Sequence, residues 1–291
     1  MSTENYHFKV GSFDCIVVSD GTFTYPHPAA VFFANAPKER LAEVLRKHNL
    51  DPEHWEEYVS PYTGLVIDTG QNRVLVDTGA GGMAPTTGKL MSSLQAEGIA
   101  PEDIGTVILT HAHPDHIGGN IDSEGKPAFP KARYVMWKDE WDFWTQEPDI
   151  SQLQVDEHIK ELIVTFARSS LPPIRGQLKL VDQETDIVPG VRAVAAHGHT
   201  PGHMAVVISS DSEQLFCTAD VALHPIHLEQ RDWYAAVDLN PEQALASRRR
   251  IMDMAAAEKA LVYASHFPFP SLGHVTQKGN AWQWHPIETI G

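Results

Sequence analysis

Short apolar runs alternate with amphipathic stretches along this chain, which predicts strands interspersed with helices. Most of the apolar runs are bounded by Gly, Pro, Asn or Asp, residues that commonly end strands. The runs at 63–68 and 73–77 flank Gly70-Gln71-Asn72 and predict a hairpin. The predicted strands are 13–19, 63–68, 73–77, 106–110, 132–136, 178–181, 191–195, 203–209, 214–217 and 260–264.

The amphipathic stretches predict the helices. Val44 and Leu45 lie three and four positions after Leu41, as residues on one face of a helix do, and a proline precedes this stretch. We find no internal repeat and no stretch with the composition of a linker, so residues 1–291 are expected to form one α/β domain. Further helices are predicted at 89–97, 138–146, 154–169 and 241–257.

Composition and charge narrow the classes of function. The chain has 22 Lys and Arg against 38 Asp and Glu, a formal net charge of −16, which disfavours binding to nucleic acid. The first residues lack the charged and apolar regions of a signal peptide, and no run of about 18 apolar residues occurs. We therefore expect a cytoplasmic protein that does not cross a membrane.

One hexapeptide contains four side chains that could bind a metal ion. Residues 111–116 read His-Ala-His-Pro-Asp-His and directly follow the predicted strand 106–110. Ligands commonly bind at the carboxyl ends of strands in α/β folds. Imidazole nitrogen suits zinc, iron, cobalt and copper, and the carboxylate of Asp115 adds a harder ligand. The pattern predicts a metal site, and a solvated His-rich loop is the alternative.

A site with two metals needs more donors than the hexapeptide offers. Three candidates each follow a predicted strand at a distance in sequence: His199, Asp220 and His266. Any one of them alone is typical of a turn or surface residue, and only together do they favour a site. His203 is not needed as a ligand and is expected to be a buried structural residue. Asp77 either orients a ligand histidine or forms a turn before glycine.

Taken in order, these motifs resemble those of the metallo-β-lactamase-fold hydrolases, over roughly residues 60 to 275. The resemblance implies an αββα sandwich, which is two mixed β-sheets flanked by helices. It also implies a first metal held by His111, His113 and His199, and a second held by Asp115, His116 and His266, with Asp220 bridging both.

The chemistry implied by that ligand set is hydrolysis by a hydroxide bridging two divalent cations. Zinc is the expected metal, with manganese, iron or cobalt as alternatives. Asp220 would act as the bridge, and Asp115 could pass a proton from the nucleophile to the leaving group. The expected substrate is a small, largely apolar ester, lactone or phosphotriester.

Within the superfamily, residues 265–274 resemble a run found in methyl parathion hydrolase and its lactonase and esterase relatives. Residues 1–60 resemble the N-terminal extension of that group, which implies contacts in a homodimer. Homoserine-lactone hydrolases have a tyrosine three positions after the bridging aspartate, where this chain has Leu223. We expect Leu223, His224 and Phe267 to line the substrate pocket.

Other functions remain open at this stage. A thioesterase resembling glyoxalase II is one, although its basic glutathione-binding tail is not evident. A mononuclear-iron sulfur dioxygenase shares the fold but needs only two His and one Asp. A β-lactam hydrolase and a non-enzymatic metal-binding protein are further alternatives.

Overall fold

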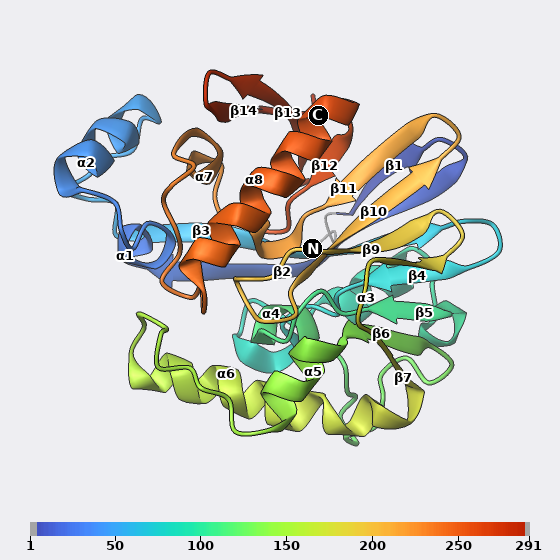
Figure 1. Cartoon of the computed structure of the whole chain (residues 1–291). Coiled ribbons are helices and arrows are strands. Elements are labelled where there is room, and N and C mark those ends of the chain that lie inside the picture. The colour runs from blue at the N-terminus through green and yellow to red at the C-terminus, as the bar shows by residue number, and fades with distance from the viewer. Residues whose placement is uncertain (1–4, 289–291) are drawn as a thin grey trace.

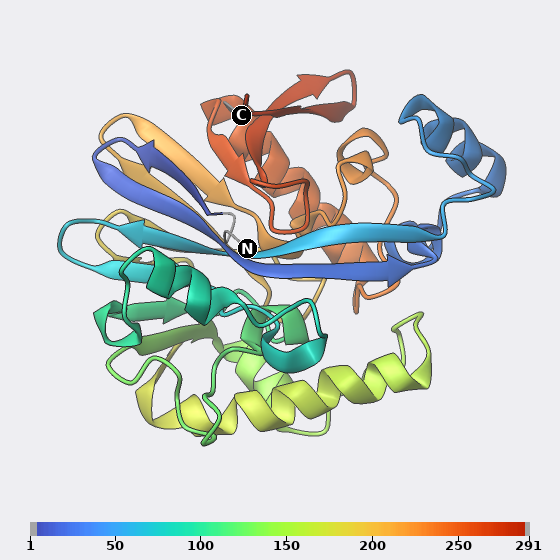
Figure 2. The same cartoon turned by 180° about the vertical axis from the view of Figure 1, so that it is seen from behind.

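The protein, described here from a computed structural model over residues 5–288, contains two seven-stranded β-sheets packed face to face (Figures 1 and 2). Within each sheet the strands lie in chain order. The first sheet pairs β1 to β4 antiparallel and β4 to β7 parallel. Its strands are β1 (Tyr6–Val10), β2 (Phe13–Pro26), β3 (Glu57–Asp68), β4 (Arg73–Val76), β5 (Thr106–Ile108), β6 (Arg133–Trp137) and β7 (Leu178–Val181).

The second sheet is built from the later part of the chain. Its neighbouring strands are antiparallel except for β11 and β12, which run parallel. Both sheets are therefore mixed, as the resemblance implied. The strands are β8 (Thr185–Val188), β9 (Val191–Ala195), β10 (Met204–Ser210), β11 (Glu213–Cys217), β12 (Leu261–Tyr263), β13 (Leu272–Lys278) and β14 (Ala281–Pro286).

Helices cover the outer face of each sheet. α3, α5 and α6 bury their apolar residues against the first sheet, and α8 packs against the second. The order of layers is helix, sheet, sheet and helix, which confirms the predicted αββα sandwich. No helix within residues 5–288 combines the length and apolar character needed to span a bilayer. The helices are α1 (Pro28–Phe32), α2 (Lys38–Lys47), α3 (Leu90–Ala96), α4 (Pro114–Ile117), α5 (Lys138–Thr145), α6 (Glu157–Ser170), α7 (Ile226–Glu229) and α8 (Pro241–Glu258).

Apolar side chains from the two inner faces form one continuous core between the sheets. Val17 and Leu65 of the first sheet belong to the same buried cluster as Val206 and Leu215 of the second. The alternation of buried and exposed positions in β2 and β9 places one face of each strand in this core. The strand ends that carry the polar motifs are thereby held in fixed relative positions.

β2 and β3 are much longer than the predicted strands 13–19 and 63–68. They form a ribbon that continues past the sheet to α1 (Figure 1). Asp20-Gly21 suggests a turn, but here the pairing register shifts between Ser19 and Gly21, and the strand continues beyond this bulge. Gly21 has φ of 112°, and a Cβ at this position would lie 2.0 Å from the carbonyl oxygen of Thr86. Only glycine fits there.

The predicted N-terminal extension, residues 1–60, contributes to the sandwich. β1 and β2 are strands of the first sheet, and Phe32 and Phe33 of the α1 region pack with Leu223 and Trp233. The strands β1, β8, β13 and β14 were not predicted, because their mixed polar and apolar residues lack a continuous apolar run. In β13, for example, buried and exposed positions alternate only from Gly273 to Thr276.

Candidate metal centre

The seven predicted donors lie in segments that follow the ends of four strands. His111 and His113 follow β5, and Asp115 and His116 lie in the short helix α4 that comes next. The turn between β9 and β10, the residues after β11 and those after β12 supply the other three, which are His199, Asp220 and His266.

The structure brings all seven side chains together in two groups. The members of each group have one ligand atom apiece, and these atoms lie within 4.8 Å of one another. The first donor group is His111, His113, His199 and Asp220, and the second donor group is Asp115, His116 and His266.

Asp220 lies between the two groups. Its Oδ2 is 3.2 Å from Nε2 of His199 and 3.6 Å from Nε2 of His111. Its Oδ1 is 3.2 Å from Nε2 of both His116 and His266. One carboxylate oxygen therefore faces each group, which is the arrangement that a bridging ligand requires.

The arrangement of the ligand atoms suits binding of a metal ion better than it suits hydrogen bonds among the residues themselves. Nε2 of His111, His116 and His266 and Oδ1 of Asp220 are buried and have no hydrogen-bond partner. Buried polar atoms are nearly always paired, because an unpaired one costs about 1–3 kcal/mol. Several unpaired acceptors converging on one place are the expected environment of a divalent cation.

Hydrogen bonds on the opposite side of the rings orient three of the imidazoles. Nδ1 of His116 lies 2.8 Å from Oδ2 of Asp77, and Nδ1 of His199 lies 2.7 Å from Oδ1 of Asp238. Nδ1 of His266 is 3.3 Å from the hydroxyl of Ser60. A carboxylate on Nδ1 favours the tautomer with a free Nε2. Asp77 thus has the orienting role that was one of its two interpretations.

Burial and neighbouring charge shift the pKa values of the histidines in opposite directions. Burial, with repulsion from His199, lowers the pKa of His113 to about 3. Burial also opposes the charged form of His199, but the carboxylates of Asp220 and Asp238 outweigh it and raise its pKa to about 9. Burial alone would raise the pKa of Asp220, yet the imidazoles of His116 and His266 hold it well below its usual value.

Two further buried residues support the donors. His203 accepts a hydrogen bond from the backbone N–H of Asp220, and its Nδ1 lies 3.0 Å from the carbonyl oxygen of Ala196. It belongs to neither donor group, in keeping with its expected structural role. Glu140 of α5 accepts from the N–H of Ala112 and Gly202, the hydroxyl of Thr200 and the indole of Trp144.

An apolar cavity of about 110 Å³ opens beside the donors. His113, Asp115 and Asp220 line it, together with residues of the β2–β3 ribbon, α1 and α6. Leu223 also lines it, as predicted from the sequence. The remaining lining residues are Phe23, Tyr25, Val31, Phe32, Tyr62, Met83, Pro114, Ile159, Leu162, Ile163 and Val237.

The other two predicted pocket residues lie elsewhere. His224 is surrounded by the rings of Phe32, Phe33 and Trp55, and burial lowers its pKa to about 3. Phe267 is fully buried, and its ring packs edge-on against Trp284. Neither is among the residues that line the cavity. Proximity in sequence to Asp220 and His266 does not decide which way a side chain points.

Several site residues could not be found in the sequence. Asp238, Glu140, Tyr25 and Tyr62 lie in segments without a motif, and nothing in the sequence assigns them to partners more than 35 positions away. A local signal existed only for Asp77, which directly follows a strand and precedes Thr-Gly.

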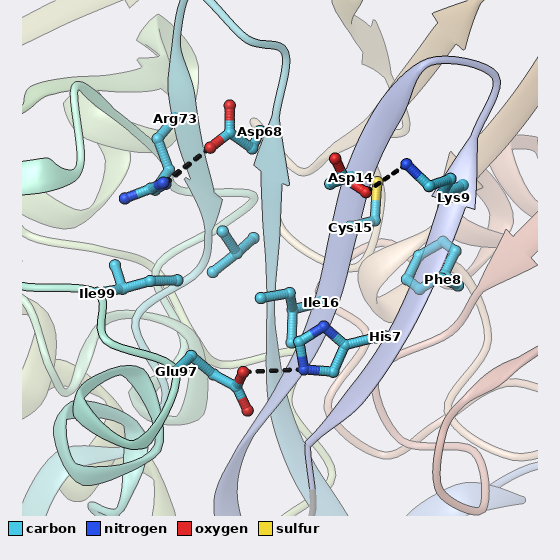
Figure 3. A pocket seen from close by; sticks show the side chains of 11 residues that line it. His7, Phe8, Lys9, Asp14, Cys15, Ile16, Asp68, Arg73, Glu97 and Ile99 are labelled. Atoms are coloured by element: carbon cyan, nitrogen blue, oxygen red, sulfur yellow. Dashed lines mark hydrogen bonds and ion pairs between the residues drawn. The ribbon is translucent and has the colours of Figure 1, made fainter.

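A larger groove of about 420 Å³ lies on the first sheet, near α3 (Figure 3). Its polar side chains pair with each other, as His7 with Glu97, Lys9 with Asp14 and Arg73 with Asp68. The groove shares no lining residue with the cavity at the donors. The groove is thus separate from the seven donors, and the candidate metal centre is the site at the donors.

Comparison with known proteins agrees with this geometry. The N-acyl homoserine lactonase AiiA of Bacillus thuringiensis subsp. kurstaki is 27% identical over 179 residues, which are 61% of this chain and 62% of AiiA. The match thus spans less than two thirds of that relative. The structure of AidC, a dizinc quorum-quenching lactonase in complex with a product, superposes with a TM-score of 0.90 at 29% identity and covers 99% of both chains.

The hydrolase AbOPH superposes with a TM-score of 0.88 over 100% of both chains, and its 24% identity shows a likeness of fold. The family description "Metallo-beta-lactamase superfamily" matches residues 59–266, a range that includes all seven donors. Because this match covers more than half of the chain, the protein belongs to the metallo-β-lactamase superfamily.

Proposed function

We propose that this protein is a metal-dependent hydrolase with a dinuclear centre, and that it opens lactones or cleaves related esters and phosphotriesters. One observation carries the proposal: two groups of mostly buried donors, several of them without a hydrogen-bond partner, share Asp220 beside an apolar cavity. A structural metal site would need four donors and no cavity.

The donors divide between two cations. His111, His113 and His199 would hold one, and the second donor group would hold the other, with Asp220 contributing to both. Zinc fits this mixture of imidazole and carboxylate, and manganese, iron or cobalt are alternatives. When bound, two such cations acidify a shared water and polarise the substrate carbonyl.

Asp115 and Asp220 are the proposed catalytic carboxylates. Asp220 fixes the spacing of the two groups, and Asp115 lines the cavity with a side chain that is 13% exposed. In hydrolysis, the water oxygen bonds to the acyl carbon, the bond from carbon to the leaving oxygen breaks, and that oxygen takes up a proton. Asp115 is positioned to receive the proton from the water and return it to the leaving oxygen.

The apolar cavity and the named relatives favour a lactone with an apolar substituent as the substrate. Aliphatic and aromatic side chains dominate the lining. AiiA and AidC are both lactonases, and AiiA acts on N-acyl homoserine lactones. The cavity offers no Lys or Arg among its lining residues, so a polyanion would find no partner.

Turnover on a panel of substrates tests this proposal. The panel contains an N-acyl homoserine lactone, an aryl ester, paraoxon and a thioester, with metal content measured on the same sample. We expect the fastest turnover on the lactone, with about two divalent ions per chain. Fastest turnover on the thioester would favour the thioesterase, and one iron per chain with oxygen uptake would favour the sulfur dioxygenase.

The second donor group argues against the dioxygenase. A mononuclear iron site needs two His and one Asp, whereas Asp115, His116 and His266 form a further group of possible ligands. Full turnover by a preparation freed of metal would reject a metal-dependent hydrolase of any kind.

The proposed assembly is a homodimer of single-domain chains, residues 1–291, with contacts from residues 1–60. Its support is the resemblance of this segment to the extension of the methyl parathion hydrolase group, together with α2, which stands out from the sandwich in Figure 1. Light scattering on the purified protein measures the mass directly, and a monomer at micromolar concentration would contradict the proposal.

A further inference from the structure

Two tyrosine hydroxyls meet in the wall of the cavity at the donors. The phenol oxygens of Tyr25 in β2 and Tyr62 in β3 are 2.7 Å apart. Both residues line the cavity together with Asp115 and Asp220. The ring of Tyr62 also packs edge-on against the imidazole of His266, with 5.5 Å between centroids. The pair therefore borders both the donors and the space for substrate.

The hydrogen-bond count of this pair leaves one proton free. Each phenol has one proton to donate, and one of the two is used in the bond between them. Within residues 5–288, neither hydroxyl has another hydrogen-bond partner. An ordinary phenol keeps its proton at neutral pH, so both groups can act as donors. One O–H is left without an acceptor from the protein, in the wall of the cavity.

The surrounding packing fixes the pair in place. Phe23 stacks on Tyr62 at 5.8 Å and meets Tyr25 edge-on at 4.9 Å, and Phe32 also packs edge-on against Tyr25 at 5.1 Å. Tyr62 is paired in register with Gly21, at the bulge of the ribbon. A donor that is already oriented loses little entropy when an acceptor arrives, which makes it effective in stabilising developing charge.

Leu223 and most of the other lining residues cannot donate a hydrogen bond to a substrate, so the free O–H of the tyrosine pair has no substitute among them. Leu223 lines the same cavity, and its side chain cannot form a hydrogen bond. Phe23, Val31, Phe32 and the remaining aliphatic lining residues likewise offer none. Among the residues that line the cavity, other than the candidate metal ligands, only the two tyrosines have a side chain that carries an O–H or N–H.

We propose that the Tyr25–Tyr62 pair donates a hydrogen bond to the acyl oxygen of the substrate, and so stabilises the negative charge that this oxygen gains during hydrolysis. This inference rests on the proposed function. One phenol contacts the substrate and the other orients it, and no proton leaves either ring. A lactone or ester carbonyl is the ligand chemistry that such a single donor recognises.

The test compares Tyr25→Phe, Tyr62→Phe and the double variant with the wild type on the lactone and on an aryl ester. We expect kcat/KM to fall by about 10- to 100-fold in at least one single variant, mainly through kcat, with metal content unchanged. The double variant should be no worse than the poorer single variant, because the two hydroxyls act as one donor. Tyr134→Phe is the matched control, since it removes a buried hydroxyl that bonds to Asn120 and Phe129.

A thiono substrate separates stabilisation of charge from a structural role. Sulfur in C=S accepts a hydrogen bond more weakly than oxygen in C=O, so the ratio of ester to thionoester rates should shrink in the variant that loses the donor. Equal losses on both substrates, or wild-type rates in both single variants, would overturn the inference and leave the proposed function intact. Absence of wild-type turnover on every substrate would instead overturn the proposed function, and the inference with it.

Discussion

Asp77 and Asp238 show how single carboxylates prepare the histidines of the centre. Each is almost fully buried and accepts a hydrogen bond from Nδ1 of one imidazole, that of His116 or His199. Backbone groups hold the carboxylates in turn, since Asp77 also accepts from the N–H of Thr110 and Asp238 from the N–H of Ala235. The rings are thus oriented before any cation binds. The same carboxylates raise the proton affinity of these two imidazoles.

That proton affinity predicts a pH dependence of metal binding. With its pKa raised to about 9, His199 holds a proton at pH 7 in the metal-free protein, and a cation must displace it. The apparent affinity for zinc should therefore rise as pH increases from 6.5 to 8.5. Competition with a zinc indicator measures it. Asp238→Asn should weaken the dependence, and an affinity that is flat over this range in the wild type would contradict the prediction.

A second prediction separates a donor from its support. Asp220→Ala should lower activity by about 1,000-fold or more and reduce metal content, because it removes the ligand shared by both groups. His203→Ala should lower the melting temperature and leave metal bound, because His203 makes structural hydrogen bonds only. Metal analysis and thermal unfolding of both variants provide the measurements. Loss of metal with an unchanged melting temperature in His203→Ala would reverse the assignment.

At the level of elements, α5 ties together two loops that carry donors. Oε1 of Glu140 accepts from Ala112, between His111 and His113, and Oε2 accepts from Gly202, in the turn after His199. Burial raises the pKa of Glu140, and the hydrogen bonds from these loops oppose the rise. One carboxylate on a helix thus sets the distance between loops from different sheets.

Glu140→Gln should disrupt this link. Its NH2 group can replace only one oxygen, so at least one buried N–H would lose its acceptor, at a cost of about 1–3 kcal/mol. We expect a lower free energy of unfolding in urea and a weaker affinity for metal. Glu157→Gln, the same chemical change at an exposed side chain, is the control. Wild-type metal affinity in Glu140→Gln would contradict the role as a link between the loops.

Periodicity and motifs predicted the elements that have a continuous apolar run, and they singled out seven candidate donors after strand ends that the structure brings together. β5, β9 and β11 and the seven donor residues are examples. The long ribbon was not predictable, because the chain continues past Asp20-Gly21 through a bulge that packs against Thr86, a residue more than 60 positions away. Asp238 and the tyrosine pair depend on contacts between distant segments, which no local pattern encodes.

For the whole molecule, the donors connect the two sheets. His111, His113, Asp115 and His116 come from the first sheet's segment of the chain, and the other three donors come from the second's. Bound cations would therefore add a link between two halves that otherwise meet through apolar packing and hydrogen bonds such as those of Glu140. Metal binding and stability of the sandwich should be coupled as a result.

Removal of metal tests this coupling. Metal at 1,000 times its Kd would stabilise the folded state by about 4 kcal/mol. Prolonged chelation should lower the melting temperature by about 10 °C and abolish hydrolysis, and zinc should restore both. Calorimetry before and after chelation measures the change. An unchanged melting temperature in a sample shown to be free of metal would exclude the coupling.

The β2–β3 ribbon supplies part of the cavity wall and none of the seven donors. Under the proposed function, residues 20–62 would form a contiguous segment for substrate choice, in which only Tyr25, Ser60 and Tyr62 would also serve the reactive centre. Mutations at other positions of this segment would then alter which acyl groups are accepted while the reactive centre stays intact. Such a division of labour lets one scaffold acquire new specificities during evolution, and it makes exchange of this segment between relatives a direct route to engineered variants.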